Sequence, residues 1–135
     1  MANEAIQRVR FSDPVDFTCA DGTGIPKGTV LALSDPRTVA ASSADNEIFA
    51  GICARDKIAS DGRTQVAVFI DGIFDITLAA AGATVVGHQV NITGANVFGP
   101  ANVTTAADFA EHAGKLLEAG NNDEVVQCAI NGANA

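Results

Sequence analysis

The feature that most constrains the fold is a set of short segments that recur about sixty residues further along the chain. Gly22 to Ser34 resembles Gly82 to Thr93, and later segments match at nearly the same offset. The matched pairs are Gly22 with Gly82, Val30 with Val90, Gly51 with Gly114, Val66 with Val126, Val68 with Cys128 and Ile70 with Ile130. The pattern favours two structural repeats, at about 22–70 and 82–130, and the alternative is coincidence among short segments that are common in β proteins.

Both halves contain strand signals that are separated by turn residues. In the first half, β-branched and apolar residues begin at Thr29, and Asp35-Pro36 ends that strand, since proline cannot donate to a central ladder. Residues 38–47 are small and polar, which predicts a loop. The segments "IFAGICARDKI" and "QVAVFI" predict two strands joined by a hairpin turn at Asp61-Gly62.

The second of these strands has no polar face. Every residue from Val66 to Ile70 is apolar, and a strand of this kind is covered on both sides. Either the other half of the chain or another subunit must cover the second side. The candidates for a subunit interface are Val66, Val68, Phe69 and Ile70.

Residues 105–120 allow two interpretations. One is a single long helix that starts at Thr105 and stops at Gly120. The repeat favours the other, a short helix at about 105–111 followed by a strand from Ala113 to Glu118. We therefore predict an all-β fold, a small barrel or sandwich that can hold two pseudo-repeats, with at most one or two short helices.

The glycine-rich stretch "ADGTGIPKGTVLALSDPRT" raises the question of a phosphate-binding loop. Such a loop needs Gly-Lys-Ser/Thr between a strand and a helix, but here Lys27 precedes Gly28 and a strand-like segment follows. Helix N-terminal amides, which would bind the phosphate, are therefore not expected. The stretch predicts a turn in which Pro26 sets φ and Gly28 takes a positive φ.

Charge and composition limit the partners and the compartment. The 135-residue chain suits one domain and carries a net charge of −8, which disfavours binding to nucleic acid or to an anionic membrane. The N-terminal residues contain no apolar run typical of a signal peptide, so we expect synthesis in a cytoplasm. The three cysteines, Cys19, Cys53 and Cys128, are then interpreted as small buried apolar residues.

The residues do not predict an active site. His88 and His112 are far apart and have no carboxylate or thiol at ligand spacing, and no strand-turn-helix nucleophile elbow is present. Asp13, Asp16 and Asp21 match no calcium loop and are interpreted as solvated carboxylates. We expect no enzyme activity, no cofactor and no metal.

The N-terminal residues 1–13 predict an arm, which precedes a single β-rich domain of residues 14–135. Arg8 and Arg10 are two of only eight basic residues in the chain. The segment "IQRVRF" alternates weakly in the manner of a strand, but no turn connects it to a neighbouring strand. Such an arm can add to the edge of a sheet.

Three stretches together resemble a known family. "PVDFTCADGTGIPKGTVLALSDPRT", "FAGICARDKIASDGRTQVAVFIDGIFDI" and "HAGKLLEAG…EVVQCAI" are similar to the capsid cement, or head decoration, proteins of tailed bacteriophages. The resemblance runs from about Ala2 to Ile130, and its most specific parts are "DGTGIPKGT", "LSDPRT" and "DGRTQVAVFIDGIFD". It departs mildly at Cys53, at Cys128 and in the long segment from Gly94 to Asp108.

The resemblance implies a role on a virion. Family members are small β-rich proteins that bind the outside of the expanded head, often as trimers at threefold positions, and stabilise it. The expected partners are the major capsid protein and the protein itself, and the expected location is the capsid exterior. Arg8, Arg10 and Phe11 are the candidates for contact with the capsid or a neighbour. The alternative is a capsid-displayed module that binds a receptor or a glycan.

Overall fold

The computed structural model describes residues 3–79, 85–101 and 106–131 and confirms the all-β class. A 3₁₀-helix, η1 (Ala106–Glu111), precedes one of the strands. The strands are β1 (Ile6–Val9), β2 (Val15–Thr18), β3 (Val30–Asp35), β4 (Thr38–Ala41), β5 (Phe49–Cys53), β6 (Gln65–Phe69), β7 (Asp71–Leu78), β8 (Gln89–Gly94), β9 (Val97–Pro100), β10 (His112–Leu116) and β11 (Val125–Asn131).

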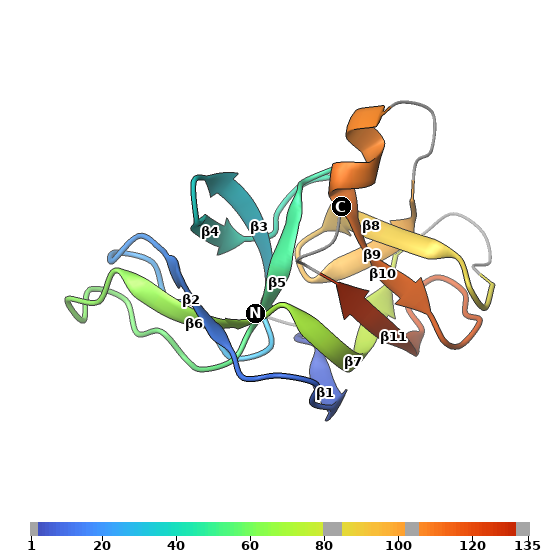
Figure 1. The fold of residues 1–135 in the computed structure, drawn as a ribbon, viewed down its shortest axis with the longest axis horizontal. Coiled ribbons are helices and arrows are strands. Elements are labelled where there is room, and N and C mark those ends of the chain that lie inside the picture. The colour runs from blue at the N-terminus through green and yellow to red at the C-terminus, as the bar shows by residue number, and fades with distance from the viewer. Residues whose placement is uncertain (1–2, 80–84, 102–105, 132–135) are drawn as a thin grey trace.

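The strands form two small barrels with the same topology (Figure 1). The first barrel closes in the order β2-β4-β3-β5-β6, and the second in the order β7-β9-β8-β10-β11. In each barrel the first and second strands of that order pair in parallel, and the other pairs are antiparallel. Strand β1 adds to the outer edge of β7. The pseudo-repeat is therefore a real feature of the fold.

The pairing register shows which residues of the two barrels are equivalent. Val68 lies opposite Val15 in the first barrel, and Cys128 lies opposite Phe74 in the second. The predicted equivalence of Val68 and Cys128 is therefore confirmed. The predicted match of Gly22 with Gly82 lies outside the described residues, because the structure does not describe 80–84.

One predicted pair is wrong by a single residue. Gly51 pairs with Leu31, and Gly114 pairs with Val90, so Val90 is equivalent to Leu31 and not to Val30. A shift of one residue moves a strand side chain to the opposite face. Leu31 lies in the core of the first barrel, whereas Val30 lies on its outer wall and packs with the core of the second barrel.

The loop predicted for residues 38–47 is also partly wrong, since Thr38–Ala41 form strand β4. Its small side chains give little local signal, and the strand forms because it pairs with β3 over a tight turn at Pro36 and Arg37.

The preferred interpretation of 105–120, a short helix followed by a strand, is confirmed: η1 ends at Glu111, and β10 follows directly. Thr105, the proposed start of the rejected long helix, lies outside the described residues.

Equivalent apolar side chains fill the two barrels. The first contains Cys19, Leu31, Val39, Ala50, Cys53, Val66 and Val68, and the second contains Leu78, Val90, Phe98, Ala113, Leu116, Val126 and Cys128. The outer wall of the first barrel packs against the second, and its ring of Phe49 meets that of Phe98 at 6.0 Å between centroids. The core of the second barrel therefore extends onto the outer wall of the first, while the interior of the first barrel forms a separate apolar cluster.

A buried asparagine connects the barrels. Asn96 lies in the β8–β9 turn, has a φ of 59° and is completely buried. Its side-chain Oδ1 accepts a hydrogen bond of 2.9 Å from the backbone N–H of Val30, and its own N–H donates to Ser42 Oγ at 2.9 Å. The turn of the second barrel is thus bonded to β3 and to the residue that follows β4 in the first.

All three cysteines are buried and free, as predicted. Burial raises the pKa of Cys53 to about 11 and that of Cys128 to about 12, and burial also raises the pKa of Cys19. Since the thiolate is the reactive form, little of any thiol is reactive near neutral pH.

We therefore expect a thiol reagent at pH 8 to modify the folded protein at least about 100-fold more slowly than the same chain in denaturant. Absorbance at the reagent's wavelength measures the rate, and the denatured sample should yield three thiols per chain. Rapid modification of one thiol in the folded protein would contradict the prediction and indicate local opening of its barrel.

Candidate functional site

The glycine-rich stretch forms a turn and not a phosphate cradle. The backbone N–H and the hydroxyl of Thr29 both donate to the carbonyl of Pro26, at 3.1 and 2.7 Å, and Gly28 has a φ of 89°. Strand β3 follows directly. A side chain at Gly28 would also clash with the arm, because its Cβ would lie 2.8 Å from Glu4 Cβ.

A buried lysine, Lys57, holds together the two loops of the first barrel that contain Asp21 and Asp61. The Nζ of Lys57 donates to Asp61 Oδ1 at 2.9 Å, to the backbone carbonyls of Asp21 and Ile58 at 2.9 and 2.8 Å, and lies 3.3 Å from Asp21 Oδ1. Burial by itself lowers the pKa of Lys57, but the hydrogen bonds and charges of Asp61 and Asp21 outweigh burial and raise it. This lysine therefore has a structural role and is not free to bind a ligand.

The carboxylate of Asp61, which pairs with Lys57, makes the stability of the fold depend on pH. The hydrogen bond from Lys57 lowers the pKa of Asp61 to about 2 from its usual 3.8. Because the folded-state pKa is the lower one, the stabilisation is complete above about pH 4 and is lost as the pH falls towards 2.

The urea concentration at the midpoint of unfolding should therefore fall as the pH falls across this window. Asp61→Asn should lower the midpoint at pH 6 and flatten its pH dependence, whereas Asp45→Asn, at an exposed loop carboxylate, should leave the slope unchanged.

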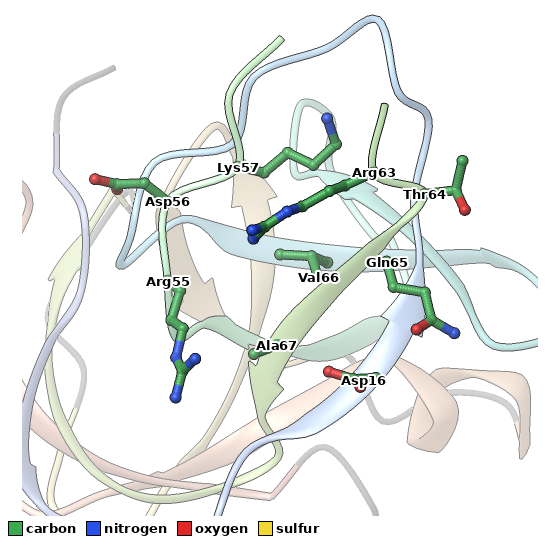
Figure 2. A pocket seen from close by; sticks show the side chains of 9 residues that line it. All are labelled: Asp16, Arg55, Asp56, Lys57, Arg63, Thr64, Gln65, Val66 and Ala67. Atoms are coloured by element: carbon green, nitrogen blue, oxygen red, sulfur yellow. The ribbon is translucent and has the colours of Figure 1, made fainter. Parts of the chain in front are cut away.

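A polar groove of about 380 Å³ lies on the first barrel (Figure 2). It is lined by Asp16, Arg55, Asp56, Lys57, Arg63, Thr64, Gln65, Val66 and Ala67. Figure 2 shows the guanidinium of Arg63 beside Val66 and that of Arg55 near Ala67. Neither guanidinium is hydrogen bonded to a carboxylate within the described part of the chain. The sequence analysis missed this groove, because its two arginines are eight residues apart in a loop without a recognisable motif.

The predicted arm residues lie on the surface beside the second barrel. Arg8 forms an ion pair with Asp75 at 2.6 Å, and Arg10 forms one with Asp13 at 2.6 Å and lies over the ring of Phe69. Phe11 is 58 % exposed and borders a groove of about 510 Å³ on the second barrel. The structure therefore brings the arm together with the second barrel and leaves its aromatic residue accessible.

The four candidates for a subunit interface are placed differently. Val66 and Val68 point into the first barrel, and Phe69 packs against Phe74 of the second, with ring centroids 5.9 Å apart. The chain's own second barrel therefore covers the second face of this strand, the first of the two alternatives. Of the four, only Ile70 is half-buried and retains surface.

No catalytic or metal-binding constellation is found among the described residues. In that part of the chain, no group of three or more His, Cys, Asp or Glu side chains is placed to hold a metal ion. Nor does the described structure contain a helix long and apolar enough to cross a bilayer.

The fold is similar to that of a solved bacteriophage protein. No family model and no curated protein sequence matches the chain. The crystal structure of the N base of head fiber gp8.5 in bacteriophage phi29 matches with a TM-score of 0.54 and 17 % sequence identity. The match covers 90 % of this chain and 97 % of that one, so the double-barrel fold as a whole is shared.

Proposed function

We propose that the protein is a structural virion protein that decorates the exterior of a bacteriophage capsid and stabilises the expanded head, as trimers at threefold positions. The observation that carries the proposal is the fold match with a phage head fiber base over nearly all of both chains. The sequence resemblance to cement proteins supports the same role, independently of the fold. The acidic surface keeps such a protein soluble before it binds.

The decisive experiment compares expanded heads with unexpanded proheads. Purified protein is mixed with each particle, the particles are pelleted, and the bound protein is quantified. We expect saturable binding to expanded heads only, and bound heads should resist heating better than bare heads. Equal binding to both particles, or none to either, would overturn the proposal.

The arm supplies the second test. Deleting residues 1–12 removes β1 and the exposed Phe11, but leaves every strand of both barrels. We expect the truncated protein to keep its β-sheet circular dichroism and to bind expanded heads at least about tenfold more weakly, since contacts multiply when several subunits engage a lattice. Unchanged binding by the folded truncation would show that the arm is not a contact.

One observation favours the alternative, a displayed module that binds a receptor or a glycan. The groove in Figure 2 offers two arginines whose guanidinium groups donate no hydrogen bond to a carboxylate among the described residues, and guanidinium groups recognise carboxylates well. Replacing both Arg55 and Arg63 by glutamine should abolish binding to acidic glycans on an array if this function holds. Head binding should be unchanged, which separates the two functions.

A further inference from the structure

The end of the first barrel at which β2 begins is open and apolar. Val15 starts β2, and Leu33 lies near the end of β3; each is 36 % exposed. Phe17 and Ile70 are half-buried there and pack against the core of this barrel. These four residues are called the first mouth below. Strand alternation places them on the side of the strands that faces the barrel interior.

The equivalent mouth of the second barrel is closed. The pairing register makes Phe74, Ile76, Ile92 and Ile130 the counterparts of Val15, Phe17, Leu33 and Ile70. All four are at most 3 % exposed, because the outer wall of the first barrel covers them. Phe69 supplies an aromatic ring directly against Phe74. A mouth of this type is thus closed by aromatic side chains that come from outside its barrel.

The chain itself offers a matching occupant in its arm. Three large apolar side chains lie within six residues there and are well exposed: Ile6 at 58 %, Val9 at 45 % and Phe11 at 58 %. The charges are also complementary. Residues 5–12 contain two arginines and no acid, although in their own chain Arg8 pairs with Asp75 and Arg10 with Asp13. Asp16 and Asp35 adjoin the first mouth in the sequence, and one cation, Arg37, lies over the ring of Phe17 there.

We propose that the first mouth binds the arm of a second copy of this chain, with Phe11 of that copy packed on Val15 and Leu33. The contact extends the proposed self-association on the capsid and rests on that function. It is heterologous, since arm meets mouth and not arm meets arm, so it can close into a ring. Phe11 then takes the place over Val15 that Phe69 takes over Phe74.

Disulfide trapping between two single-cysteine additions tests the contact in solution, without heads. Phe11→Cys and Leu33→Cys proteins are mixed under mild oxidation, and dimers are counted on a non-reducing gel. We expect the mixture to form dimers at least about tenfold faster than Phe11→Cys mixed with Ile58→Cys, because docking raises the effective concentration of the two thiols. Ile58 is a suitable control because it is 70 % exposed on the loop between β5 and β6.

A second variant checks the apolar contact itself. Val15→Asp should slow the trapping reaction to the control rate in a protein whose circular dichroism is unchanged, while Ile58→Asp should not. No excess of mixed dimers over the control overturns the proposal, as does equal dimer formation by Phe11→Cys alone, which would indicate arm-to-arm contact. Because heads are absent from this experiment, the two failures can be told apart: failure to trap the dimer refutes the arm-to-mouth contact, and failure to bind heads refutes the decoration role on which it rests.

Discussion

Replacing Gly51 or Gly114 by alanine is expected to lower the free energy of unfolding by about 3 kcal/mol or more, a large part of the about 5–15 kcal/mol typical of a folded domain. The two glycines are equivalent, and each follows a bulged alanine, Ala50 or Ala113, at which the pairing shifts. A Cβ at Gly51 would lie 2.5 Å from Val68 Cγ1, and one at Gly114 would lie 2.8 Å from Ile130 Cα.

At both sites the clash with the added Cβ cannot be removed by a side-chain movement alone, because some of the clashing atoms belong to the backbone of the neighbouring strand. A Cβ at either glycine would also meet a backbone carbonyl oxygen, of Phe69 or of Ala129. Urea unfolding followed by circular dichroism measures the loss. The matched control is Gly22→Ala, since nothing lies within 4 Å of a Cβ built there. A loss below about 1 kcal/mol at both glycines would show that the strands can separate more easily than the packing implies.

The second large effect is expected for Asn96→Ala, at about 3 kcal/mol. The change leaves the N–H of the completely buried Val30 without its acceptor, which costs about 1–3 kcal/mol. Alanine must also hold the positive φ of 59°, which costs about 1–2 kcal/mol more. Because Asn96 connects the barrels, the unfolding transition should also lose cooperativity.

Two controls separate these causes. Asn96→Gly removes the acceptor but tolerates the positive φ, so it should lose only the hydrogen-bond part. Arg37 occupies the equivalent turn position in the first barrel, with a φ of 49°, but it is exposed. Arg37→Ala should therefore cost less than Asn96→Ala. Equal losses at the two positions would mean that the contact between the barrels contributes no more than the exposed hydrogen bond of 2.7 Å from Arg37 to the Asp16 carbonyl, which Arg37→Ala removes.

Local patterns in the sequence determine the class of the fold and its duplication. Runs such as "QVAVFI" combine β-branched and apolar residues, and their recurrence sixty residues later follows from equivalent positions in two barrels. The turn at Pro26 and Gly28 is likewise local, because proline sets one φ and glycine permits the other. The short helix before β10 could be predicted from the repeat, and the burial of the thiols from the cysteine spacing and the expected compartment.

Tertiary structure alone decides the rest. Strand β4 consists of small residues that give little local strand signal, so pairing with β3 and β2 makes it a strand. The register of β3 moved the repeat match from Val30 to Leu31. The candidate surfaces depend on this register. The equivalent mouths of the two barrels differ: Phe74 is buried because the outer wall of the first barrel covers it, whereas within the described part of the chain Val15 stays 36 % exposed. Burial of that kind is a long-range property, and no local pattern in the sequence reports it.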